Sequence, residues 1–209
     1  MSDSIDTPSG EGSKPVSAQW VSDQPISGQQ VLLIFLLSGW LTVSLFVWFS
    51  AGVTFEVLSI KKTPEISNRF TEIPEVRRER LLRQTAGAIN RKMFRGWNVA
   101  QLIGGLIILG LFFRVLPETG QSPQVHKYMA IAAFSIVLAH ALFLGPGIAQ
   151  SGSLLDAPDP VIAAQAARQF GIYHGVYMSS DLLKVVLVGW LLWIVFEQIR
   201  SEEHTSELQ

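Results

Sequence analysis

The stretch FGIYHGVYMSSDLLKVVLVGWLLWIVF, residues 170–196, ends as an unbroken apolar run but begins with ionisable and hydroxyl side chains. A helix of about 20 apolar residues is long enough to cross the ~30 Å hydrocarbon core of a bilayer. Soluble helices of that length carry a charged face, which the second half of this stretch lacks. Comparable apolar segments recur, so we expect spans at residues 31–58, 97–116, 125–144 and 173–196. The predicted fold class is an all-α membrane protein, a four-transmembrane-helix antiparallel bundle.

The two ends of the chain differ in composition from the spans. Residues 1–28 are rich in Ser, Asp, Gly, Pro and Gln without an apolar run, which predicts a disordered N-terminal tail rather than a signal peptide. The last ten residues, RSEEHTSELQ at 200–209, are the in-frame translation of a common sequencing-adapter stretch, so we expect an artefactual tail there. The expected four-helix domain then covers residues 29–199.

Basic residues are concentrated in one loop. Ten of the 16 Lys and Arg residues fall between Lys61 and Arg95, whereas the N-terminal tail holds only Lys14. By the positive-inside rule this loop is cytoplasmic, which places both termini outside a cell membrane of the bacterial inner-membrane type. The connection at 145–170 is then also inside, with Asp159 and Pro160 suited to start a helix.

The basic loop also carries a helical apolar pattern. Leu82, Ala86, Ile89 and Met93 recur at separations of 4, 3 and 4 residues, which predicts an amphipathic helix over 74–94 at the cytoplasmic headgroups. Two interpretations stay open for its basic residues. In the first, these residues are solvated and only set the topology. In the second, the Arg77–Arg95 segment contacts anionic lipid or a protein partner.

The polar part of the last span forms a stripe. His174, Tyr177, Asp181 and Lys184 are separated by 3, 4 and 3 residues, so they share one helix face, with Ser180 beside it. Facing lipid would cost several kcal/mol, so we expect the stripe to face the other helices and Asp181 to pair with Lys184. Three hypotheses follow: a paired stripe that sets helix register, a proton or ion route, and an amphiphile-binding cleft.

Other spans carry polar residues at a similar depth. Asn98 and Gln101 lie inside the second span, Glu56 near the cytoplasmic end of the first, and His140 near the cytoplasmic end of the third. Together with the stripe they make a candidate polar cluster on the cytoplasmic side. Polar residues that only hold helices together would give the same pattern.

Two histidines raise an alternative with a cofactor. His126 and His140 are 14 residues apart, a spacing that resembles the paired haem-ligating histidines of membrane cytochromes b. His174 lies at the level of His140, so a haem b held by His140 and His174 is conceivable. The position 14 residues after His174 is Val188, so a second ligand pair is incomplete. We therefore expect no cofactor, with haem b as the alternative.

Several function classes find no support in the sequence. With no cysteine there is no disulfide, thiolate metal site or cysteine nucleophile. There is no P-loop, GxSxG, HExxH or set of His and carboxylate residues at metal-ligand spacing, so we expect neither an enzyme nor a metal site. The aromatic residues fit span packing and interfacial belts rather than a nucleic-acid surface.

Three stretches resemble a known family. They are FSAGVTFEVLS (49–59), LFLGPGI (142–148) and FGIYHGVYMSSDLLKVVLVGWLL (170–192). They are similar to a family of small four-helix membrane proteins of unknown function related to eukaryotic transmembrane protein 205, over most of residues 35–195. The resemblance implies the four-helix fold and carries over His174. The basic loop departs from that family's shorter connection.

The resulting functional prediction is an uncharacterised integral membrane protein whose direct surroundings are the lipid bilayer. It is expected to be a non-enzymatic accessory protein, or one that handles a small molecule or ion in a transport-related role. The alternatives are a haem b electron-transfer subunit and a structural assembly partner. The expected protein partners are further copies of the chain, in a homo-oligomer, or another membrane protein.

Overall fold

A computed structural model describes residues 27–59, 61–63, 65, 68, 69, 71–115 and 123–207. The predicted disordered tail lies outside the described residues except for its last two positions. The described chain is helical, and no β-strand occurs within these ranges. Its elements are α1 (Gly28–Val57), α3 (Glu75–Val115), α4 (Pro123–Ala139), a π-helical turn (His140–Leu144), α5 (Gly145–Ser153) and α6 (Pro160–Glu207).

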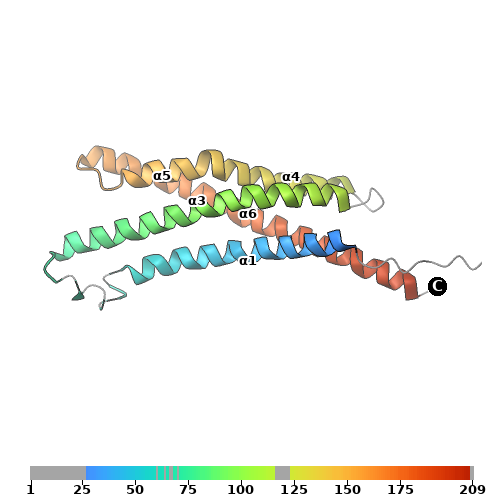
Figure 1. The fold of residues 1–209 in the computed structure, drawn as a ribbon. Coiled ribbons are helices and arrows are strands. Elements are labelled where there is room, and N and C mark those ends of the chain that lie inside the picture. Colours follow the sequence, from blue (N-terminus) through green and yellow to red (C-terminus); the bar gives the residue numbers. More distant parts are fainter. Residues whose placement is uncertain are drawn as a thin grey trace, which may run out of the picture.

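Four helical segments are long and apolar enough to cross a membrane: Gly28–Val57, Glu75–Arg114, Gln124–Ser153 and Pro160–Arg200. Each overlaps one of the four apolar segments expected from the sequence, so the prediction of four apolar helices long enough to span a membrane is confirmed. Figure 1 shows the segments side by side, with α1 packed against α3 and α6, and α4 packed against the same two helices. The end of α1, the starts of α3 and α6 and the end of α5 lie together at one end of the molecule.

Local capping fixes where two of the helices begin. The Ser27 hydroxyl accepts the Gln30 backbone N–H, and the Gln30 side chain in turn accepts the Ser27 N–H, so α1 starts with a capping box. At the other helix, the Asp159 carboxylate accepts the Val161 N–H at 2.8 Å, directly before Pro160. Helix α6 therefore starts where the sequence predicted it.

Helix α3 differs from the prediction of a separate amphipathic helix lying flat at the headgroups. The basic segment and the second apolar segment form one helix of 41 residues, about 60 Å long at 1.5 Å per residue. A single Gly96 between them costs only about 1 kcal/mol, which packing outweighs. Ala86 is fully buried and the Asn90 amide donates to the Ala51 carbonyl, whereas Ile89 of the predicted apolar face is 47% exposed.

The basic half of α3 is tied to the turn that precedes α6. Arg80 and Arg83 each approach the Asp156 carboxylate at 3.5 Å. The Gln84 amide donates to the same carboxylate at 2.9 Å. Exposed pairs of this kind contribute little singly, but three contacts on one acceptor hold the start of α3 against the connection between α5 and α6.

The third apolar segment continues beyond its expected end at Leu144. A π-helical turn carries the chain into α5, which runs to Ser153. Within the turn, the Gly145 N–H donates to the His140 carbonyl, five residues earlier. Proline in a regular helix clashes with the carbonyl four residues before it, and the wider turn gives Pro146 room to follow without ending the helix.

Apolar side chains fill the end of the molecule away from the basic residues. The largest fully buried ones are Leu33 and Leu37 from α1, Phe112 from α3, and Val188 and Leu191 from α6. Ala130 and Ala133 of α4 allow close approach of the backbones to this core. The interior of this half of the molecule is therefore apolar.

Gly145 is the one glycine whose substitution tests the π-helical turn. A Cβ atom there would lie 2.8 Å from the His140 carbonyl oxygen and 3.2 Å from the Asn98 amide nitrogen. We expect Gly145→Ala to lower the unfolding temperature in detergent by several degrees. Gly104→Ala is the matched control, since a Cβ at Gly104 meets nothing within 4 Å and alanine favours the helix. Equal stability of the two variants would contradict this view of the turn.

Candidate functional site

The Asp181 carboxylate is the centre of a buried polar cluster. Lys184, one turn further along α6, donates to one carboxylate oxygen, and the Trp48 indole N–H donates to the other at 2.5 Å. His140 Nδ1 lies 3.5 Å from the oxygen that accepts Lys184. Asp181 is 2% exposed, and Lys184 and His140 are 0% exposed. With His140 neutral, the two opposite charges make this cluster electrically neutral.

Lys184 also links α6 to α3 and α1. Its ammonium group donates to the Gln101 side-chain carbonyl. The same oxygen accepts the Trp40 indole N–H at 3.2 Å. Lys184 is thereby surrounded by hydrogen-bond acceptors from two helices although no part of it reaches the surface. Such partners are what make a buried charge tolerable.

His140 joins the charges to a second, uncharged group of partners. Its Nε2 lies 2.7 Å from the Ser180 hydroxyl, and its ring stacks on Tyr177 with the ring centres 4.0 Å apart. The Ser180 hydroxyl lies 2.7 Å from the Val176 carbonyl, to which it can donate. The Tyr177 hydroxyl donates to the Asn98 side chain at 3.1 Å. A continuous set of contacts, in which ring stacking joins Tyr177 to His140, thus runs from Asn98 to the Asp181 carboxylate.

The structure brings together most of the residues that the sequence singled out: Asn98, Gln101, His140, Tyr177, Ser180, Asp181 and Lys184. Two candidates lie elsewhere. Glu56 is exposed at the end of α1 and pairs with Lys62 at 3.0 Å, because the following turn folds back to it. His174 stacks on Phe170, with the ring centres 5.5 Å apart, one turn of α6 away from Tyr177.

Sequence reasoning missed the contribution of the first span. Trp40, Ser44 and Trp48 recur every four residues on one face of α1, and Trp40 and Ser44 are buried. A buried indole needs an acceptor for its N–H, so tryptophans on the polar face were a usable signal. Assigning the tryptophans to span packing and interfacial belts concealed it.

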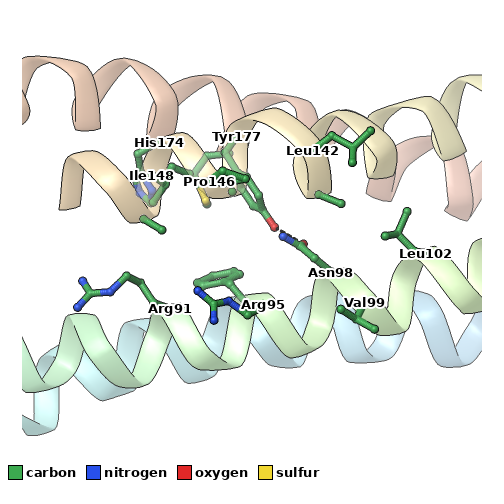
Figure 2. A pocket seen from close by; sticks show the side chains of 15 residues that line it. Arg91, Arg95, Asn98, Val99, Leu102, Leu142, Pro146, Ile148, His174 and Tyr177 are labelled. Atoms are coloured by element: carbon green, nitrogen blue, oxygen red, sulfur yellow. Dashed lines mark hydrogen bonds between the residues drawn. The ribbon is translucent and has the colours of Figure 1, made fainter. Parts of the chain in front are cut away.

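A cavity of about 370 Å³ adjoins the cluster between α3, α5 and α6. In Figure 2, Arg91, Arg95 and Asn98 project from α3 toward the side that holds His174 and Tyr177. Asn98 and Tyr177 line the cavity and also belong to the polar cluster. Their hydrogen bond forms the wall between the cavity and the buried charges.

The haem alternative fits these residues poorly. His140 Nε2 is engaged with Ser180, its Nδ1 faces the Asp181 carboxylate, and Tyr177 covers its ring. Ligation of an iron by His140 would therefore require the loss of at least one of these contacts. Across the described parts of the chain, no group of three or more His, Asp or Glu residues is arranged to hold a metal ion.

Comparisons with protein-family models, with curated proteins and with solved structures find no match to this chain. Function is therefore inferred from the site alone.

The pairing of Asp181 with Lys184 predicts a non-additive effect on stability. Asp181→Asn and Lys184→Gln each leave one buried charge without its partner, which costs about 3–5 kcal/mol. The double variant removes both charges and should be more stable than either single variant. Thermal unfolding in detergent measures the coupling.

The exposed pair Glu56–Lys62 is the matched control for this cycle, since its side chains are more than half exposed. We expect a coupling of less than about 1 kcal/mol there. Effects at Asp181 and Lys184 that simply add would show that the two charges do not depend on each other.

Proposed function

We propose that this protein is a multi-pass membrane protein, built as an antiparallel four-helix bundle, that holds a small molecule or ion at the buried polar cluster as a non-enzymatic accessory or transport-related component. The observation that carries the proposal is the asymmetry of the interior. Polar groups and a cavity of about 370 Å³ occupy the half toward the basic segment, and the interior of the other half is an apolar core.

Outward-facing apolar side chains support insertion in a bilayer. Phe35 and Phe49 of α1 and Trp193 of α6 are 72%, 70% and 62% exposed. Soluble proteins rarely expose apolar surface so extensively. Lipid chains would cover these side chains, while the helices satisfy their own backbone hydrogen bonds.

The extent of the polar contacts favours a binding site over a continuous conduction path. Beyond Gln101 and Trp40, the next buried residues along the molecule are apolar, with Ile108, Phe112 and Leu191 filling the section. A path for ions or protons needs polar groups or water along its whole length. A guest would therefore enter and leave through the half that carries the cavity.

Some buried polar atoms in and near the cluster are not fully hydrogen-bonded. Ser44 Oγ and Gln101 Nε2 have no hydrogen-bond partner among the described protein atoms, and His140 Nδ1 has only the Asp181 carboxylate nearby, at 3.5 Å. Buried polar side chains are paired in the great majority of proteins, and the exceptions are concentrated at functional sites. A polar cluster that served only to hold helix register would gain from satisfying these atoms within the protein.

Orientation in the membrane has its own test. We expect Lys61–Arg95 and Ser151–Phe170 in the cytoplasm, because cytoplasmic loops are enriched in Lys and Arg. Topology-reporter fusions after Thr85 and after Gly120 should give opposite sidedness. A periplasmic signal from the Thr85 fusion would reverse the orientation.

Access from one side can be measured with cysteine labelling, because the 209-residue sequence contains no cysteine. Ala149 lines the cavity, whereas Ala133 is 3% exposed in the apolar core. We expect a sulfonated, membrane-impermeant maleimide to modify Ala149→Cys from the side that carries the basic segment. Ala133→Cys is the matched control and should react only after unfolding. If Ala149→Cys resists the reagent as Ala133→Cys does, the cavity is not an entrance and the proposed binding function fails.

A further inference from the structure

The walls of the cavity combine an apolar body with a cationic end. Val99, Leu102 and Leu142 line one part of it, and Arg91 and Arg95 line another. Among the described residues that line the cavity there is no Asp or Glu. The chemistry of the walls therefore matches a molecule with a hydrocarbon part and a negative charge.

Arg91 and Arg95 differ from Arg80 and Arg83 in having no acidic partner among the described residues. Arg80 and Arg83 approach Asp156, whereas no ion pair or hydrogen bond joins Arg91 or Arg95 to any described side chain. Their spacing of four residues places both guanidinium groups on one helix face, where like charges repel. An anion between them would remove that repulsion and accept several hydrogen bonds.

Glycines leave room around the Arg91 guanidinium group. A Cβ atom at Gly87 would lie 3.2 Å from one Arg91 terminal nitrogen, and a Cβ at Gly152 would lie 3.8 Å from it. Arg91 thus rests between α3 and α5 against backbone rather than against a carboxylate. Figure 2 shows Arg91 at one end of the labelled group and Leu102 at the other.

Size distinguishes between classes of amphiphile. A volume of about 370 Å³ corresponds to roughly a dozen water-sized groups at about 30 Å³ each. From Arg91 to Leu102 the helix advances by about 16 Å. These dimensions suit one hydrocarbon chain of about twelve carbons with a compact head better than two full-length acyl chains.

We propose that this cavity binds a single-chain amphiphile with an anionic head, a long-chain carboxylate. The head lies between Arg91 and Arg95 near the membrane surface, and the chain extends past Val99 toward Leu102 and Leu142. The inference rests on the proposed function, because it needs the cavity to be open at the basic end. It adds the class of ligand, which the polar cluster alone does not specify.

The position of the cavity also connects the ligand to the buried charges. Tyr177 and Asn98 both line the cavity, and Tyr177 also stacks on the His140 ring and donates its hydroxyl to Asn98. A bound chain would contact Tyr177 and Asn98, which separate the cavity from the polar cluster. Occupancy of the cavity and the arrangement around Asp181 are therefore coupled by direct contact.

Protection of an introduced cysteine provides the test. Protein with Ala149→Cys is placed in nanodiscs of zwitterionic lipid, and the rate of modification by the impermeant maleimide is followed with and without dodecanoate. We expect dodecanoate to slow the reaction at least about fivefold, since the bound molecule would cover residue 149. Dodecyltrimethylammonium has the same chain with the opposite charge, and acetate has the head without the chain. Neither should protect.

Charge-matched variants identify the residues that bind the head. Arg91→Gln with Arg95→Gln should abolish protection by dodecanoate, whereas Arg77→Gln with Lys92→Gln removes as many charges outside the cavity and should leave it intact. Arg95→Gln alone should raise the dodecanoate concentration for half protection about tenfold, as expected for the loss of one charged hydrogen-bonding group. This single variant serves if the double variant unfolds, which its thermal unfolding curve shows.

The outcomes separate the two proposals. If Ala149→Cys reacts freely but dodecanoate does not slow it, or if the cationic amphiphile protects equally, the ligand class is wrong while the open cavity stands. Protection that persists in Arg91→Gln/Arg95→Gln also overturns the inference. If phosphatidylglycerol nanodiscs slow the reaction without any dodecanoate, the occupant is a bilayer lipid rather than a single-chain carboxylate. Failure of Ala149→Cys to react at all removes both proposals.

Discussion

The ion pair between Asp181 and Lys184 is the contact on which the arrangement of the helices depends. Two charges buried in an apolar surrounding are stable only when every partner is in position. Here the partners come from the other three segments: Trp48 from the first, Gln101 from the second and His140 from the third. In a membrane, where apolar surfaces gain little by meeting one another, such contacts define which faces of the helices meet.

The same requirement explains why polar and apolar residues are separated along the molecule. Once the charges lie at the level of Gln101, the groups that neutralise them must lie there too, and the remaining section can be filled by Phe112, Leu191 and similar side chains. Packing in the apolar section stabilises the bundle but does not determine which helix faces meet. The polar contacts determine which helix faces meet. Beside them, the space next to Tyr177 is left open as the cavity.

Hydropathy and residue spacing predicted the four apolar helices and the face shared by Tyr177, Asp181 and Lys184, because both depend on local periodicity alone. Helix ends were less predictable. Gly96 and the pair Gly145–Pro146 are signals for a break, but contacts with distant segments kept both helices continuous. The cavity and the role of Trp48 could not be read from the sequence, because each depends on how three helices approach one another.

The π-helical turn lets one continuous helix serve two different neighbours. Each residue of an α-helix advances the direction of its side chain by about 100°, and the wider turn inserts one residue between α4 and α5. The side chains of α5 are therefore rotated about the helix axis relative to the positions that an uninterrupted α4 would have given them. His140 can face Asp181, while Gly147 lies against the Tyr173 ring, where an added Cβ would be 3.0 Å from the ring atoms. The two parts of this continuous helix can therefore turn different faces toward their neighbours. The residue at the π-helical turn, His140, faces the buried charges, and residues of α5 line the cavity.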